Sequence, residues 1–235
     1  MCEQFVARAA EPFRLDELWP FVDRLERYGI GGFGWGVSWL ADGRLKSHRS
    51  TAAFADDAER DRLGLVETTA LLVHLRRPSR LSTIGLPDAQ PFDDPDGRFA
   101  FSHNGDLRDY RDAREAYRRQ GRIRGRADSE VGARWLEDAW SGPTGARDTL
   151  CRLHDHFGGR ANLATIADDG SVHHYAGNDE NPVFAFRLGR VGIAATGIYS
   201  LDRSLFRFVA PEATGRRLVR TGRTIALDPA GTPLG

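Results

Sequence analysis

The hydrophobic pattern predicts that a strand and a helix open the chain. Residues 2–9 form a short apolar stretch typical of a first strand. A helical repeat follows it, at Leu15, Leu18, Trp19, Val22 and Leu25. Pro20 marks the point where this helix begins or kinks, and Gly29 is its expected end.

Short segments rich in β-favouring residues predict further strands in the first half of the chain. Val37–Leu40 and Arg44–Arg49 flank Asp42-Gly43, a strong signal for a tight turn between two strands. Residues 68–75 predict a buried strand, and Phe99–Ser102 predicts another.

Helical periodicity dominates the middle of the chain, and strands close it. Three helices are expected, one through Leu107, Tyr110, Ala113 and Tyr117, one from near Asp128 to Trp140, and one over Leu150–Phe157. The closing strands are expected at Asn162–Ala167, Val172–Tyr175, Val183–Arg187, Val191–Thr196 and Thr224–Leu227. This order lacks strict strand–helix alternation, so it favours an α+β fold with largely antiparallel sheets. Without a repeat or a long linker, a single domain over residues 1–235 is the first expectation, and two small domains the second.

The charge balance narrows the classes of partner. Lys plus Arg and Asp plus Glu both number 33, which argues against a dedicated binder of nucleic acid or of anionic membranes. No apolar stretch approaches the 18 residues of a transmembrane helix, and the first residues lack a signal-peptide pattern. We therefore expect a cytoplasmic protein. Two cysteines exclude a disulfide scaffold and a structural zinc site built from CxxC pairs.

Cys2 is the first candidate for chemistry. If Met1 is removed, Cys2 carries a thiol nucleophile and a free α-amine that can accept its proton. The alternative interpretation is an incidental cysteine near the end of the chain.

Asn104-Gly105 is the second candidate. Asn-Gly is the strongest short signal for a hairpin turn, but the residues after Gly105 have helical rather than strand periodicity. A strand-to-helix corner is therefore expected here. At such a corner an Asn side-chain amide and a Gly N–H can donate to one oxygen, as an oxyanion hole requires.

Two charged residues complete the candidate set. Arg76 follows the apolar strand of residues 68–75 and could bind a carboxylate with two parallel hydrogen bonds, or simply cap the strand at the surface. Asp128 opens a helix and could bind an ammonium group, or act only as a favoured N-terminal residue of that helix.

These segments occur in the order found in one family. The chain resembles the class II glutamine amidotransferases, which are N-terminal nucleophile hydrolases, and especially their short, stand-alone members. The matching pieces lie within about residues 1–140 and are Met1-Cys2-Glu3, Gly34-Trp35-Gly36-Val37, His74-Leu75-Arg76, Gln90-Pro91-Phe92, Phe101-Ser102-His103-Asn104-Gly105 and Asp128-Ser129-Glu130.

The resemblance implies a four-layer αββα sandwich with two mostly antiparallel sheets. It also implies that Cys2 attacks the γ-amide of glutamine or of a γ-glutamyl compound and forms a thioester. Asn104 and Gly105 would then stabilise the oxyanion. Arg76 would bind the substrate α-carboxylate and Asp128 its α-ammonium, with Ser79 and His103 completing the substrate-binding set. No cofactor or metal is implied. The partner implied is a small-molecule γ-glutamyl substrate. The chain would either hydrolyse this compound itself or pass the released ammonia to a separate synthase subunit, and the sequence does not choose between the two.

The sequence departs from the family pattern beside the site. Phe33 replaces an Asp before Gly34-Trp35-Gly36, Gln90 replaces a His, and Ala127 replaces a Thr. The turn after Arg76 is Arg77-Pro78-Ser79-Arg80-Leu81, in which Ser79 stands for the usual Thr or Asn. Arg77 and Arg80 add positive charge here, which suggests a more anionic γ-glutamyl substrate.

Two other functions remain open at this point. The chain could be an inactive relative that binds an amino acid as a sensor or partner subunit, an interpretation that retention of Met1 would favour. A metal hydrolase is a weaker alternative, because His154, His156, His173 and His174 suggest ligands. However, adjacent histidines on a strand point to opposite faces.

Overall fold

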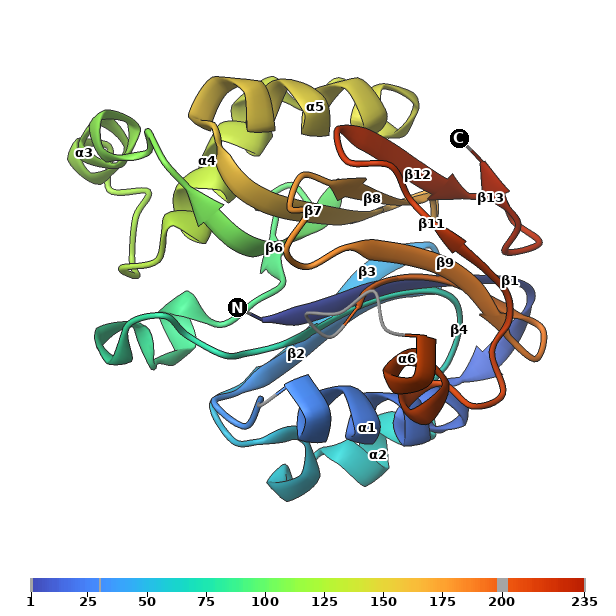
Figure 1. The fold of residues 1–235 in the computed structure, drawn as a ribbon. Helices are drawn as coiled ribbons and strands as arrows, with labels where there is room; N and C mark the ends of the chain where they lie inside the picture. Colours follow the sequence, from blue (N-terminus) through green and yellow to red (C-terminus); the bar gives the residue numbers. More distant parts are fainter. Residues whose placement is uncertain (1, 30, 198–202, 235) are drawn as a thin grey trace.

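Two stacked antiparallel sheets form the centre of the molecule, and helices cover both outer faces (Figure 1). The computed structural model describes residues 2–29, 31–197 and 203–234. The α+β fold with mostly antiparallel sheets, expected from the element order, is confirmed, and the layers follow the αββα order implied by the resemblance.

The larger sheet carries the start of the chain. Over the described residues it has seven strands in the order β11 (Thr214–Leu218), β9 (Val183–Leu188), β10 (Val191–Thr196), β1 (Glu3–Arg14), β4 (Glu67–Leu75), β2 (Trp35–Ala41) and β3 (Arg44–Ser50). β1 is central and pairs antiparallel with both β4 and β10. The Asp42-Gly43 turn joins β2 and β3, as predicted.

The smaller sheet carries the second half of the predicted site. In the described part of the chain its six strands run in the order β13 (Pro233–Leu234), β12 (Arg223–Leu227), β8 (Val172–Ala176), β7 (Gly159–Ala167), β6 (Phe99–Leu107) and β5 (Phe92–Asp93). β6 and β7 pair along their whole length, from Phe99 opposite Ala167 to Leu107 opposite Gly159.

The helices divide between the two outer faces. The larger sheet is covered by α1 (Trp19–Gly29), α2 (Arg60–Gly64) and α6 (Arg203–Val209), and the smaller by α3 (Arg111–Arg119), α4 (Asp128–Ala139) and α5 (Ala146–Phe157). Buried apolar residues form one cluster under each helical layer and a third between the sheets, where Val6, Leu72 and Ile166 meet. Burial of apolar surface in these three layers is the main force that stabilises the sandwich.

The expected strand-to-helix corner at Asn104-Gly105 is wrong. β6 continues through both residues to Leu107, and α3 begins only at Arg111. Gly105 keeps its place in the ladder with a φ of +138°, and a Cβ there would lie 1.9 Å from the carbonyl oxygen of Arg160. Only glycine fits this kinked strand, so the Asn-Gly pair marks a deformation within a strand and not a turn.

Other element boundaries also differ from expectation. β1 extends to Arg14 through a register irregularity between Arg8 and Phe13. α1 begins at Trp19, so Pro20 sits in its first turn, where proline is tolerated. The elements α2, α6 and β11 were not expected from the hydrophobic pattern.

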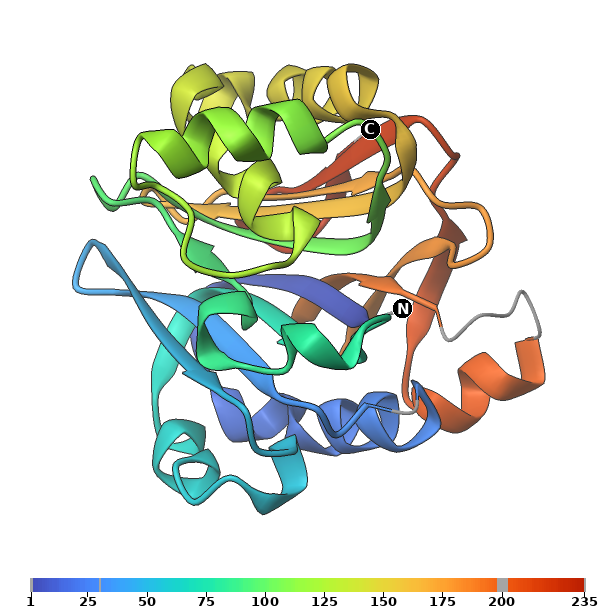
Figure 2. The same cartoon turned by 90° about the vertical axis from the view of Figure 1, so that its left-hand side faces the viewer.

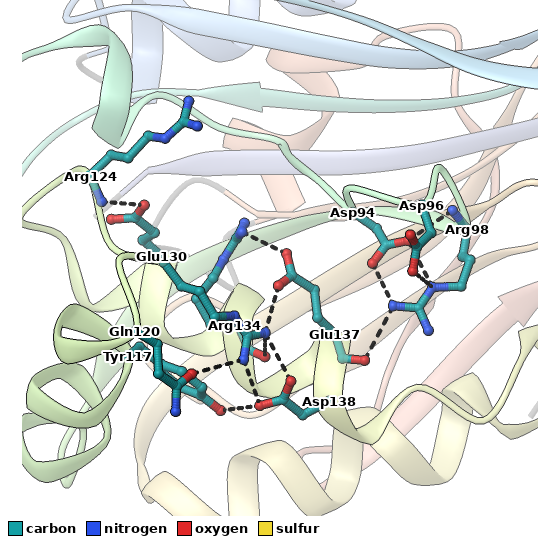
Figure 3. A network of polar contacts seen from close by, with 11 residues as sticks. Asp94, Asp96, Arg98, Tyr117, Gln120, Arg124, Glu130, Arg134, Glu137 and Asp138 are labelled. Atoms are coloured by element: carbon teal, nitrogen blue, oxygen red, sulfur yellow. Dashed lines mark hydrogen bonds and ion pairs between the residues drawn. The ribbon is translucent and has the colours of Figure 1, made fainter.

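An ion-pair network ties α4 to its neighbours (Figure 3). Arg122, which follows α3, donates to Glu137 at 2.9 Å and to Asp138 at 2.8 Å on α4. Arg98, directly before β6, binds the fully buried carboxylate of Asp94 at 2.6 Å and also donates to the backbone carbonyl of Glu137. These bonds fix the helix that begins at Asp128.

Of the helices in the described ranges, none has both the length and the apolar character needed to cross a membrane. The four histidines considered as metal ligands are dispersed. His154 bonds the Tyr175 hydroxyl at 2.9 Å, whereas His174 contacts Gln4 between the sheets. Within the described residues, no group of three or more His, Cys, Asp or Glu side chains is arranged to hold a metal ion.

Candidate active site

The start of β1 lies at the edge of the interface between the two sheets, which Figure 2 turns toward the viewer. Gln4 faces the smaller sheet, since its Oε1 accepts a hydrogen bond of 2.6 Å from Ser102 on β6. Side chains alternate along a strand, so Cys2 lies on the same side of the chain as Gln4. Met1 is outside the described residues, so the structure does not bear on its removal.

The Cys2 thiol is held against the loop that follows β4. Its Sγ accepts a hydrogen bond from the backbone N–H of Arg77, with a distance of 3.3 Å between the two heavy atoms. Burial raises the pKa of the thiol, although the Arg77 N–H and the positive charge of Arg76 oppose the change. Near neutral pH the sulfur is therefore protonated, and a nucleophilic attack needs a neighbouring base to take the proton.

A cavity of about 280 Å³ opens beside this thiol. Of the residues predicted from sequence, Cys2, Arg76, Ser79, His103, Gly105 and Asp128 all line it. They come from the start of β1, the end of β4 and the loop after it, β6, and the N-terminus of α4. The fold thus brings together residues that lie more than 120 positions apart in the chain.

Asn104 does not line the cavity wall but lies next to it. On β6 its neighbour His103 points toward α4, where its ring contacts Ser129, so the Asn104 side chain points toward the larger sheet. Asn104 is fully buried, and neither its amide nitrogen nor its amide oxygen has a hydrogen-bond partner among the described residues. A buried amide without partners is costly, and catalytic use is one accepted reason for keeping one.

The Arg76 side chain is held by backbone carbonyl groups of the segment that follows β4. Its guanidinium donates to the backbone carbonyl oxygens of Thr83 and Asp88 and is almost completely buried. A guanidinium has five N–H donors, so three remain beyond these two bonds. Burial lowers the pKa of Arg76, but the group stays cationic at neutral pH, because the ordinary value is above 12.

Asp128 is oriented by backbone donors. One carboxylate oxygen accepts the Leu107 N–H at 2.8 Å, and the other accepts the Ser129 N–H at 3.0 Å. The loop before α4 is fixed as well, because Asp88 accepts the N–H groups of Arg126 and Ala127, both at 2.6 Å. A negative charge is thereby held at the edge of the cavity, where it can meet a cation of a ligand.

Gln90 is a site residue for which the sequence predicted no role, although it belongs to the Gln90-Pro91-Phe92 motif, where it replaces a His. It lines the cavity, and its Oε1 accepts the N–H of His103 at 2.6 Å. Its Nε2 donates to the His103 carbonyl at 3.1 Å and to Ser129 at 3.2 Å. The His103 ring is thus clamped through its backbone and through Ser129, with its Nε2 buried and unpaired at the cavity. The signal available in the sequence was a polar residue directly before a proline in a turn-rich segment.

A buried polar chain lies below the site, between the sheets. Ser102 bonds His74 at 2.7 Å as well as Gln4, and Gln4 contacts His174 at 3.4 Å. Burial lowers the pKa of His74, and it lowers that of His174 to about 3, so both rings are neutral at physiological pH. These hydrogen-bonded side chains link β4, β6, β1 and β8 without introducing charge between the sheets.

The fold is similar to that of solved glutamine amidotransferase structures. A glutamine PRPP amidotransferase from B. subtilis superimposes with a TM-score of 0.76 at 19% identity, over 99% of this chain and 49% of that one. A structure described as an allosteric regulatory enzyme of purine biosynthesis gives 0.75 at 17% identity, over 97% of this chain and 47% of the other.

A third structure matches over nearly its whole length. It is a glutamine aminotransferase class-II domain protein from Silicibacter pomeroyi, with a TM-score of 0.60 and 17% identity over 98% of both chains. The chain spans about half the length of the first two structures. No protein-family profile matches the sequence, and no curated protein matches it. The fold implied by the resemblance is thus confirmed, whereas the roles of individual residues stay predictions.

Proposed function

We propose that the chain is an amidohydrolase of the glutamine amidotransferase type, which cleaves the γ-amide of glutamine or of a γ-glutamyl compound through a thioester on Cys2. The proposal rests on the position of two groups, the Cys2 thiol and the Asn104 side-chain amide, which belong to facing sheets. The Cys2 thiol opens to a polar cavity, and the unpaired Asn104 amide lies on the strand that forms the cavity wall.

The first step joins the Cys2 sulfur to the γ-carbonyl carbon. The thiol proton passes to the α-amine of Cys2, which is free once Met1 has been removed. The carbonyl oxygen becomes negative and accepts hydrogen bonds from the Asn104 Nδ2 and the Gly105 N–H. The C–N bond then breaks, and the ammonium formed on Cys2 returns its proton to the leaving amine.

The second step returns the enzyme to its first state. Water attacks the thioester carbon, and the α-amine takes a proton from the water. The C–S bond then breaks to release glutamate, and the ammonium passes its proton to the Cys2 sulfur. Throughout, the zwitterionic end of the substrate is held by two opposite charges. Arg76 binds the α-carboxylate, and Asp128 binds the α-ammonium.

The test is glutamate release from L-glutamine and from simple γ-glutamyl amides. We expect Cys2→Ala to lower turnover more than about 1000-fold, since the covalent step is lost. Cys151→Ala is the matched control, because Cys151 is the other free cysteine and lies on α5, away from the cavity. Intact-mass measurement of the wild-type protein is expected to show that Met1 is absent.

The opposite result would assign a different role. If Cys2→Ala retains turnover within tenfold of wild type, the thioester mechanism is wrong. If no γ-glutamyl amide is cleaved while glutamine still binds, the chain is an amino-acid-binding relative that acts as a sensor or partner subunit.

A further inference from the structure

The cavity beside Cys2 has a large excess of positive charge. Six arginines line it, at positions 76, 77, 80, 108, 111 and 126, against two aspartates, Asp106 and Asp128. The whole chain, by contrast, has equal numbers of basic and acidic residues, 33 of each. The sequence pointed to three of these arginines, Arg76, Arg77 and Arg80, and the fold adds Arg108, Arg111 and Arg126 from distant segments.

The glutamyl part of a substrate does not use this excess. Its α-carboxylate and α-ammonium carry opposite charges, and one cation with one carboxylate match them. In the proposed function Arg76 and Asp128 take these roles. Arg77 supplies the backbone N–H that contacts the Cys2 sulfur. The arginines that remain, Arg80, Arg108, Arg111 and Arg126, also line the cavity and have no role toward the glutamyl part.

Four of these arginines have exposed side chains on fixed backbone. Arg80 follows β4, Arg108 and Arg111 flank the connection from β6 to α3, and Arg126 precedes α4. None of the four side chains has a hydrogen bond or ion pair to another described residue, although their loops are anchored. The Arg126 N–H donates to Asp88 at 2.6 Å, and the Arg80 carbonyl accepts the Thr83 hydroxyl at 2.7 Å.

Several like charges around one opening repel each other and create a positive potential that attracts anions. A single exposed ion pair contributes little, but a cavity lined by one sign of charge focuses the field on a ligand. Carboxylate and phosphate groups both match the planar fork of donors on arginine.

We propose that the substrate is a γ-glutamyl conjugate whose amine part carries an anionic group, a carboxylate or a phosphate, held by Arg80, Arg108, Arg111 and Arg126. This inference rests on the proposed function and names its substrate class. On cleavage the γ-C–N bond breaks, glutamate is released after hydrolysis of the thioester, and the anionic amine leaves with a proton from the Cys2 ammonium.

The experiment compares three conjugates that differ at one end. They are γ-glutamylglycinamide, which is neutral there, γ-glutamylglycine, which ends in a carboxylate, and γ-glutamyl-aminomethylphosphonate, which stands for a phosphate. At low ionic strength we expect kcat/KM to be at least about tenfold higher for one or both anionic conjugates than for the neutral one. The preference is expected to shrink in about 0.5 M salt, where screening is strong. The better of the two anionic conjugates identifies the anion.

Substitutions of arginines test which side chains cause the preference for anionic conjugates. The double variant Arg80→Gln, Arg126→Gln is expected to reduce the ratio of anionic to neutral kcat/KM severalfold. Arg119→Gln is the matched control, because Arg119 on α3 is also exposed but does not line the cavity. Equal kcat/KM values for the three conjugates in the wild-type protein, or an equal loss of the ratio in the control, would overturn the proposal.

Binding to Cys2→Ala, measured by calorimetry, separates this inference from the proposed function. If the wild-type protein cleaves none of the conjugates but Cys2→Ala binds an anionic one at least about tenfold more tightly, the catalytic proposal fails and the anion site stands. If the three bind equally, or none binds, the anion site is wrong even where glutamine is hydrolysed.

Discussion

Two groups of arginines in the molecule are used in opposite ways. In the network around α4, Arg98 is paired with the fully buried Asp94 (Figure 3). Arg122 is paired with the mostly buried Glu137 and with the half-exposed Asp138. Around the cavity, Arg80 and Arg126 are exposed, and their side chains have no partner among the described residues. The difference shows why counting arginines in an arginine-rich sequence says little until the fold shows which of them are neutralised within the protein.

We expect the largest loss of stability where a buried carboxylate loses the arginine that is paired with it. Arg98→Met leaves Asp94 buried with backbone N–H donors but without its cation, so we expect a loss of about 3 kcal/mol in the free energy of unfolding. Urea denaturation at pH 7 measures it, with Arg119→Met as the control. A loss no larger than that of the control would show that Asp94 does not depend on this pair.

The Arg98–Asp94 pair also determines how the loss of stability in Arg98→Met depends on pH. Burial works to raise the pKa of Asp94, but the hydrogen bonds from Arg98 prevail and lower it. The stabilisation is therefore present above the ordinary carboxyl pKa and disappears as the pH falls through the lowered value. Wild type and Arg98→Met are expected to converge in strong acid.

Glu3 is a buried carboxylate that forms no ion pair with a described residue. Its contribution to the pH dependence of stability is expected to be smaller and of opposite sign. Among the described residues, the Glu3 carboxylate bonds Thr196 and Asn181. Burial raises its pKa to about 7, although these hydrogen bonds and the positive charge of Arg77 oppose the change. A raised folded-state pKa stabilises the protein at low pH, and this contribution is lost as the pH rises through about 7. Between pH 5 and 7.5 we expect this group to lower wild-type stability by about 2 kcal/mol.

Glu3→Gln tests that expectation, because the amide keeps a polar group of the same size and cannot ionise. Urea denaturation across this pH range is expected to show a flatter profile for the variant than for wild type. Parallel profiles would mean that Glu3 titrates normally in the folded protein.

The smallest effect is expected where both partners are exposed. Arg118 and Glu115 form an ion pair on the outer surface of α3, with 68% and 49% of their side chains exposed. Water and salt screen such a pair, so Arg118→Gln is expected to leave the unfolding midpoint without measurable change. A clear decrease of the midpoint would show that this exposed pair contributes to stability as a buried pair is expected to do.

Much of the fold followed from local patterns. The Asp42-Gly43 turn, the strand over residues 68–75 and the helix from Asp128 combine a clear period with clear end signals, so sequence and structure agree there. Asn104-Gly105 misled, because its turn propensity is local, whereas the pairing of β6 with β7 is a long-range effect. A residue pair that ordinarily reverses the chain was kept in line by a strand more than 50 residues away.

The candidate site was predicted unevenly for a similar reason. Cys2, Arg76 and Asp128 belong to motifs with a chemical meaning that does not depend on knowing their neighbours. Gln90 and Arg126 acquire a role only through contacts that the fold creates, to His103 in one case and to the cavity in the other. No periodicity or composition signal carries such contacts.

The proposed nucleophile and the proposed oxyanion donors are mounted on different sheets. Cys2 precedes β1 in one sheet, whereas Asn104 and Gly105 belong to β6 in the other, and the hydrogen bond between Gln4 and Ser102 joins the two close by. A slide of one sheet over the other by the width of an atom would leave every strand and helix intact and yet separate the reacting groups. The proposed enzymatic activity therefore depends on the relative alignment of the two sheets. It should fail earlier, on gentle denaturation, than any spectroscopic signal that reports secondary structure.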